Sequence, residues 1–192
     1  MAHLSPEDVL IRMWRTPNPY ALKFTLNVPL KQTGKATFHA PEEAPNLPLV
    51  QSLFSIPGIK RVYLFQNQMT LTHEGQISEK EMEEQVTAIV RTRIQVHDPN
   101  FMEEQKPSVN TVKKSDDPII SQIDEILDRT VRPGLQADGG DLEVLSVENN
   151  QVKIAYQGAC GGCPSAMTGT LEAIENILQH EMNKPDLTVI PV

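Results

Sequence analysis

The only two cysteines of this 192-residue chain, Cys160 and Cys163, stand three positions apart in a Cys-x-x-Cys pair. Gly161 and Gly162 separate them, and Pro164 follows the second cysteine. Thiolates at this spacing are ligands that suit a soft metal centre. Because the chain has no other cysteine, the pair cannot supply a disulfide that joins distant parts of the fold. The pair therefore indicates metal or redox chemistry.

We expect both thiols to lie on a loop between a strand and a helix. Pro164 suits the first turn of that helix, where its missing N–H costs nothing. The N–H groups and dipole of a helix N-terminus favour negative charge and lower the pKa of a nearby thiol. Gly158, Gly161 and Gly162 remove side chains around the sulfurs and let backbone N–H groups approach an anion. This pattern predicts two adjacent thiolates on an uncrowded loop.

Two thiolates are half of the four protein ligands that a tetrahedral zinc site or an iron–sulfur cluster generally takes. A second copy of the chain would supply the other two, and a dimer with its loops face to face could hold a [4Fe–4S] or [2Fe–2S] core. A centre at such a subunit seam would be exposed and weakly caged, which suits delivery rather than catalysis. The histidines show no spacing that pairs with the cysteines: His3, His39, His73, His97 and His180.

Other uses of the cysteine pair stay open at this point. A dithiol/disulfide redox protein also places Cys-x-x-Cys at a helix start, although here Gly161 and Gly162 stand between the cysteines and the proline follows them. Zinc or another metal is a further alternative, and absence of any function is the last. A Cys-Pro ending also occurs in ferredoxin ligand runs. We therefore favour cluster ligation.

The segment 117–192 contains the cysteine pair. Its sequence pattern predicts a small domain whose helices and strands follow the order α-β-β-α-β. A helix opens at Asp117-Pro118, and we expect it to bury Ile119, Ile123, Ile126 and Leu127 and to be interrupted at Pro133-Gly134. Asp138-Gly139-Gly140-Asp141 is typical of a turn into a strand, with glycine at positive φ. Strands are expected at 142–147, 152–156 and 187–190, and a second helix between the last two. Helices covering a three-stranded sheet would bury both apolar stripes.

The segment 1–97 predicts a second small domain, and 98–116 a linker. Strands are expected at 9–14 and 22–28, a short helix at 47–54, and a hairpin of strands 59–65 and 69–72. Ser78 and Glu81 form a capping box that opens a helix with Met82, Val86, Ile89 and Val90 on its apolar face. Trp14 and Tyr20 could form a peptide-binding surface, but we favour packing in the core of this domain. The overall expectation is a two-domain α+β protein.

Composition and charge exclude several classes of partner. The chain is 39% apolar and carries a net charge of -8, and the segment from Asp117 to Val192 holds twelve acidic against four basic residues. This balance argues against nucleic acid and against an anionic membrane surface. No run approaches the roughly 18 apolar residues that cross a bilayer. The first residues lack the features of a secretory signal, so we expect an intracellular protein.

Two motifs together resemble a known family. Gln136-Ala137-Asp138-Gly139-Gly140-Asp141 followed by Gly158-Ala159-Cys160-Gly161-Gly162-Cys163-Pro164-Ser165 closely resembles the C-terminal domain of NifU, the Nfu family. Upstream, Arg15-Thr16-Pro17-Asn18-Pro19 and the stretch Leu53–Val62 are similar to the Nfu N-terminal domain. The resemblance covers about 1–97 and 117–192.

The resemblance implies an iron–sulfur cluster scaffold or carrier rather than an enzyme. Family members bind a [4Fe–4S] cluster between two chains, which makes Cys160 and Cys163 the ligands by motif match. The implied partners are a second copy of the chain, upstream cluster-assembly proteins and client apo-proteins. The N-terminal domain is expected to aid partner selection, and no ligand residue carries over to it. Without a transit peptide, a cytoplasmic location is expected. An adaptor with a structural cluster is a further alternative.

Overall fold

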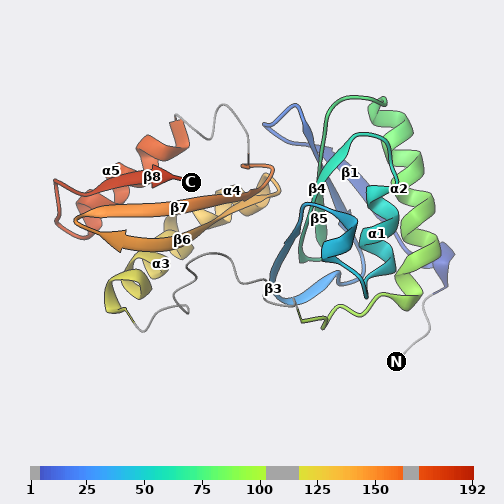
Figure 1. Ribbon diagram of the computed structural model, residues 1–192, viewed down its shortest axis with the longest axis horizontal. Coiled ribbons are helices and arrows are strands. Elements are labelled where there is room, and N and C mark those ends of the chain that lie inside the picture. The colour runs from blue at the N-terminus through green and yellow to red at the C-terminus, as the bar shows by residue number, and fades with distance from the viewer. Residues whose placement is uncertain (1–4, 103–116, 162–168) are drawn as a thin grey trace. The chain divides into compact units, whose positions relative to one another are not determined.

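The structure, a computed structural model, describes residues 5–102, 117–161 and 169–192 of the chain. The chain divides into two compact units, Met1–Glu103 and Glu104–Val192, which we describe one at a time. Each unit combines one β-sheet with helices (Figure 1). The predicted α+β class is therefore confirmed.

The first unit is built on a five-stranded antiparallel sheet with the strand order β1-β2-β5-β4-β3. Helices α1 and α2 lie on the same side of this sheet (Figure 1). The predicted strands and helices are present, and β3 is a strand that the sequence analysis did not predict. The elements are η1 (Pro6–Asp8), β1 (Ile11–Arg15), β2 (Ala21–Leu26), β3 (Lys31–Phe38), η2 (Pro41–Glu43), α1 (Pro48–Phe54), β4 (Ile59–Gln66), β5 (Gln68–His73), α2 (Glu79–Arg93) and η3 (Ile94–Val96), where η marks a 3-10 helix.

Local signals in the sequence set the ends of two of these elements. At the start of α2, the Ser78 hydroxyl oxygen accepts a hydrogen bond from the Glu81 N–H at 3.3 Å. The Glu81 carboxylate in turn accepts one from the Ser78 N–H at 2.9 Å. Between β4 and β5 the chain turns at Gln66, which has a φ of 51°. The predicted capping box and the predicted hairpin are both confirmed.

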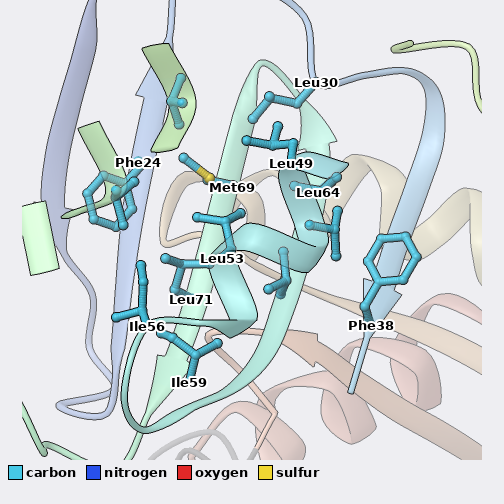
Figure 2. Close-up of a cluster of buried hydrophobic side chains, with 14 of the residues drawn as sticks. Phe24, Leu30, Phe38, Leu49, Leu53, Ile56, Ile59, Leu64, Met69 and Leu71 are labelled. Carbon is cyan, nitrogen blue, oxygen red and sulfur yellow. The ribbon is translucent and has the colours of Figure 1, made fainter. Parts of the chain in front are cut away.

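The core of the first unit lies between the sheet and its helices. Figure 2 shows Leu49 and Leu53 of α1 among Leu64, Met69 and Leu71 of the sheet, and all five side chains are fully buried. Alternate residues of each strand face this core, since successive side chains of a strand point to opposite faces. The predicted apolar face of α2 also packs here, with Met82, Val86 and Val90 buried and Ile89 partly buried.

Two aromatic residues that we expected in this core lie at the surface instead. Trp14 is 45% exposed and Tyr20 is 54% exposed. In β1 the neighbours of Trp14 on the core side are Ile11 and Met13, which pack against the buried cluster. Because side chains alternate along a strand, Trp14 must then face the other side of the sheet. The core-packing prediction for these two residues is wrong.

The chain after α2 continues to pack on the first unit as far as Phe101. The ring of His97 is buried, and its Nε2 lies 2.7 Å from the carbonyl oxygen of Leu30. The Gln32 N–H donates to the carbonyl oxygen of Pro99 at 2.8 Å. Phe101 packs against the hydrophobic core. Pro99 and Phe101 of the proposed linker therefore contact β3, and the boundaries of domains and linker stay a prediction.

The second unit has a three-stranded sheet of order β6-β7-β8, in which β6 and β7 are antiparallel and β7 and β8 are parallel. Helices α3 and α5 contact each other and the sheet. In the described residues of both units, no helix is long and apolar enough to cross a membrane. The elements are α3 (Pro118–Thr130), α4 (Arg132–Ala137), β6 (Gly140–Glu148), β7 (Gln151–Gly158), α5 (Leu171–Glu181) and β8 (Thr188–Pro191).

The predicted order α-β-β-α-β is confirmed, with α4 as an additional short helix. The first helix ends before the predicted interruption, because α3 stops at Thr130 and Pro133 and Gly134 lie inside α4. The β6–β7 hairpin turns at Asn149 and Asn150, with φ angles of 51° and 62°, which match the turn that suits twisted strands. One prediction about the first helix is wrong: Ile119 is 37% exposed, and Ile120 is buried in its place. Asp117 caps α3 by accepting from the Ile119 N–H at 2.9 Å, as its position before Pro118 predicts.

Candidate functional site

Cys160 lies in a tight turn directly after β7. Its N–H donates to the carbonyl oxygen of Gln157 at 3.2 Å, and the Gly161 N–H donates to that of Gly158 at 3.2 Å. Gly158 has a φ of 58°, in the left-handed region that glycine adopts without a steric cost. A side chain at this position would strain the backbone. Gly158 therefore sets the direction in which the chain leaves the strand toward the cysteine.

A second glycine turn faces the first, where α4 leads into β6. Gly139 has a φ of 82°, and its N–H donates to the carbonyl oxygen of Gln136 at 3.1 Å. The carbonyl oxygen of Gly139 accepts from the Ala159 N–H at 3.0 Å, so the two turns are hydrogen-bonded to each other. Gly140 then pairs with Gly158 in the β6–β7 ladder. The turn predicted for the Asp-Gly-Gly-Asp stretch is confirmed.

Gly140 makes room for the cysteine. A Cβ atom added at Gly140 would lie 2.2 Å from the Sγ of Cys160 and 2.9 Å from its backbone N. Both separations are far below van der Waals contact, and the second involves backbone rather than a side chain that could rotate. Only glycine fits at this position while Cys160 keeps its place. The two motifs of the sequence are thus in direct contact in the fold.

The surroundings of Cys160 differ from the sequence expectation. Cys160 is buried, with only 7% of the residue exposed. It belongs to the same buried cluster as Leu142 of β6 and Ile154 of β7. The prediction of an uncrowded, exposed position is therefore wrong for Cys160, because the sulfur occupies the space that Gly140 leaves on the core side of the sheet.

The rest of the predicted loop, from residue 162 onward, lies outside the described residues. This part includes Gly162, Cys163 and Pro164, so the placement of Pro164 in the first turn of a helix stays a prediction. The helix that follows, α5, is described from Leu171 onward. In the parts of the chain that the structure describes, no three His, Cys, Asp or Glu side chains are grouped to hold a metal ion.

A charged cluster holds the start of β6 in place. Arg132 pairs with Asp124 and Asp128 of α3, and its Nε lies 3.6 Å from the Oδ1 of Asp141. Asp141 is 2% exposed, and its Oδ1 also accepts from the Leu142 N–H at 2.7 Å. A buried carboxylate needs such compensation, because an unpaired charge in a protein interior is costly. The cluster ties the residue after Gly140 to α3 and α4.

Electrostatics keep Arg132 charged within this cluster. Partial burial lowers the pKa of Arg132, but its hydrogen bonds to Asp124 and Asp128 raise it, and the net pKa is above the ordinary value. Arg132 was not predicted as a functional residue from the sequence. A signal was available, since Asp124, Asp128 and Arg132 follow one another at intervals of four residues, the spacing of side-chain ion pairs on a helix, although in the structure Arg132 begins the next helix, α4.

Tyr156 is a second residue that the sequence analysis missed. Burial, and to a smaller extent the electrostatic interaction with Cys160, raise the pKa of Tyr156 to about 12, so its hydroxyl stays protonated at neutral pH. That hydroxyl is buried and has no hydrogen-bond partner among the residues that are described. The sequence carried a signal for Tyr156: side chains alternate between the two faces of a strand, so Tyr156 and Gly158, two positions apart in β7, share one face. The site thus places a protonated phenol near the thiol.

Comparisons with known proteins match both units. Residues 11–97 match the family model "Scaffold protein Nfu/NifU N terminal", and residues 123–190 match "NifU-like domain". The chain is 30% identical over 180 residues to NifU-like protein 5, mitochondrial, of Arabidopsis thaliana, with 92% of this chain and 66% of that protein covered. It is 31% identical over 172 residues to NFU1 iron-sulfur cluster scaffold homolog, mitochondrial, of Homo sapiens, with 89% and 67% covered.

The chain therefore spans about two thirds of the length of these curated relatives. A solution structure of a NifU-like protein from Saccharomyces cerevisiae overlaps 50% of this chain and 87% of that one, with 14% identity and a TM-score of 0.43, too low to add weight. The sequence matches are sufficient, because they include both units and reach 31% identity over most of the chain. By these matches the chain belongs to the Nfu family, whose members are scaffolds rather than catalytic enzymes.

Proposed function

We propose that this protein holds an iron–sulfur cluster through Cys160 and Cys163 and passes it to apo-proteins. Membership of the Nfu family supports the general role. The position of Cys160 supports its part as a ligand: its sulfur is fixed where two hydrogen-bonded glycine turns meet, and Gly140 leaves space for it. This fixed sulfur is the observation that carries the proposal.

The number of thiolates determines how the cluster is held. One chain supplies two cysteine ligands, and a [4Fe–4S] cluster generally takes four. A homodimer with the cluster between its two chains completes the set without any other residue type. A [2Fe–2S] cluster would need the same four thiolates, so the ligand count alone permits both. We propose the [4Fe–4S] form, which the family resemblance implies.

Transfer to a client is an exchange of ligands. Each of the four Fe–S(Cys) bonds to the scaffold breaks as an iron–thiolate bond to a client cysteine forms. The client thiols lose their protons and the departing scaffold thiolates take up protons, so no electron is gained or lost. Client apo-proteins receive the cluster and upstream assembly proteins supply it. Because the chemistry is exchange and not turnover of a substrate, the protein acts as a carrier.

The test is anaerobic reconstitution of the wild type and of Cys163→Ala and Cys160→Ser, followed by iron and sulfide analysis and native mass measurement. We expect four iron atoms per two wild-type chains, as a [4Fe–4S] cluster requires, and loss of the cluster in both variants. Far-UV circular dichroism provides the control that each variant is folded. A full cluster in Cys163→Ala, or a wild-type monomer that holds a complete cluster by itself, would contradict the proposal.

Two further parts of the proposal have simple assays. Reduction of insulin disulfides by the iron-free protein would favour the dithiol redox alternative, and we expect no appreciable turnover. Rapid transfer to an apo-ferredoxin would exclude a purely structural cluster. We propose a cytoplasmic location, whereas the names of the relatives described above include "mitochondrial". Cell fractionation with an antibody against the chain distinguishes the two locations.

A further inference from the structure

Strand β1 forms a free edge of the five-stranded sheet. No other strand pairs with its outer side within residues 5–102. The Asn27 N–H donates to the Leu10 carbonyl oxygen at 3.2 Å, so the even-numbered residues of β1 are the hydrogen-bonded ones in this antiparallel ladder. The odd-numbered residues Ile11, Met13 and Arg15 therefore direct their N–H and C=O groups away from β2.

At the opposite edge of the same sheet, the chain itself covers the start of β3. At β3, the Gln32 N–H donates to the carbonyl oxygen of Pro99 at 2.8 Å. The Lys31 side chain, which is buried, donates to the carbonyl oxygen of Phe101 and lies over its ring. An uncovered strand edge is a template for pairing with another chain. Within residues 5–102, the chain gives β1 no such cover, and we take β1 as the edge available to a partner.

A groove of about 570 Å³ runs along this free edge. It is lined by residues of β1, β2 and α2, and its charged side chains are Arg12, Lys23 and Arg91, with no acidic residue among those that line it. Its apolar side includes Leu10, which is 68% exposed, and Trp14, which is 45% exposed. The groove is therefore basic and partly apolar in a chain whose net charge is -8.

We propose that this groove binds an extended, acidic segment of a partner protein, which adds to β1 as a sixth strand. The main-chain groups of Ile11, Met13 and Arg15 would supply the hydrogen bonds, as in other cases of strand addition. Side chains of an added strand alternate between the two faces of the sheet. Acidic side chains on one face meet Arg12, and those on the other face meet Arg91.

Charge complementarity selects this occupant over a second copy of the chain. An antiparallel pairing of two β1 edges centred on Arg12 would oppose Arg12 of one copy to Arg12 of the other, and like charges across strands are destabilising. The Arg12 guanidinium lies 5.4 Å from the centre of the Trp14 ring. This cation–π contact holds the guanidinium on the face of β1 that Trp14 occupies, where it can meet an acidic side chain of an added strand. The proposal concerns the first unit alone and does not depend on cluster binding.

Trp14 provides a direct measurement, because it is the only tryptophan of the chain and lies in the groove. The full chain is titrated with a ten-residue peptide that alternates glutamate and valine, and with its lysine-for-glutamate counterpart. We expect a saturable change of tryptophan fluorescence with the acidic peptide only, weakening as salt screens the charges. No saturable change with the acidic peptide would overturn the proposal, as would tighter binding of a ten-nucleotide thymidine oligomer.

A matched pair of variants tests the charge argument. Arg91→Glu reverses a charge in the groove, whereas Lys80→Glu makes the same change on the same helix, where Lys80 has an 85% exposed side chain and does not line the groove. We expect Arg91→Glu to weaken binding of the acidic peptide about tenfold or more and Lys80→Glu to change it less than about twofold. Equal effects of the two variants would overturn the proposal.

A second pair tests the addition of a strand. Arg15 ends β1, its N–H faces outward, and its side chain forms an exposed ion pair with Glu79 at 3.0 Å. Arg15→Pro removes that N–H, and an edge strand tolerates proline where the N–H faces solvent, while Arg15→Ala keeps it. We expect the proline variant to bind the acidic peptide about fivefold more weakly than the alanine variant, the loss of roughly one hydrogen bond. Equal binding by two folded variants would overturn strand addition.

Discussion

Replacement of Gly140 by alanine tests whether the fold fixes the sulfur of Cys160. The new Cβ would lie 2.2 Å from the Sγ of Cys160, 3.1 Å from its Cβ and 2.9 Å from its N. Gly140 does not have a positive φ, so the substitution adds no backbone strain of its own. Its effect is therefore purely one of space. A change of the Cys160 rotamer would relieve the contact with the sulfur but not the contact with the backbone.

The required displacement follows from these distances. Ordinary van der Waals contact begins near 3.4 Å, so the Cys160 nitrogen must move by about 0.5 Å and the sulfur by about 1.2 Å. The neighbouring hydrogen bond from Ala159 to Gly139, now 3.0 Å, would lengthen with it. Overpacking of this kind typically costs about 1–3 kcal/mol. A ligand displaced by more than the roughly 0.5 Å that a binding site tolerates should also lose cluster content, to below about half of wild type.

Urea unfolding of the iron-free protein and iron analysis after anaerobic reconstitution measure the two effects. Gly134→Ala is the matched control, because Gly134 lies in α4, lacks a positive φ and has nothing within 4 Å of an added Cβ. We expect that control to be neutral or to stabilise by about 0.5–1 kcal/mol, with full cluster content. If Gly140→Ala matched the control in both measurements, or bound more iron than wild type, the argument that Gly140 positions the sulfur would be refuted.

Three further predictions concern stability, each measured by urea unfolding. Arg132→Ala leaves the carboxylate of Asp141 buried without its cation and should cost about 3–5 kcal/mol; a loss below about 1 kcal/mol would contradict the buried-pair argument. Burial lowers the pKa of His97 below 6.5 despite its bond to Leu30. The unfolded chain then binds the proton more readily, so stability should fall as pH drops below about 6.5, and His97→Gln should reduce that dependence; an unchanged pH profile would refute it. Ser78→Ala should cost about 1 kcal/mol by removing the α2 cap, and an unchanged unfolding midpoint would refute that role.

Elements with a strong local signal could be predicted from the sequence. The capping box at Ser78, the Asp117-Pro118 start and the alternation of β2 and β7 each depend on residues close together in the chain, and the structure has all of them. Strand β3 lacked such a signal. It contains Gly34 at a φ of 73° and an irregular register with β4, and its first half is polar. Pairing with β4 makes it a strand, and pairing is not readable from a local pattern.

Some features of the candidate site could likewise be predicted from the sequence, and others could not. The composition of the cysteine loop and its likeness to a family could be read from the sequence, because residue type and spacing carry that information. The contact between Gly140 and Cys160 could not, since it joins residues twenty positions apart through the β6–β7 pairing. The same pairing explains why Cys160 is buried although it follows three polar or small residues. Burial depends on which strand lies opposite, and so it required the structure.

The two units place different physical tasks in different parts of the chain. Acidic charge and the thiol are in the second unit, whereas the basic groove and the free strand edge are in the first. If partner selection and cluster holding are separate, their perturbations must be separable. Arg91→Glu should then weaken peptide binding with cluster content intact, and Gly140→Ala should reduce cluster content with peptide binding intact. A variant of one unit that abolished both properties would show that the units act as one, whatever the origin of the coupling.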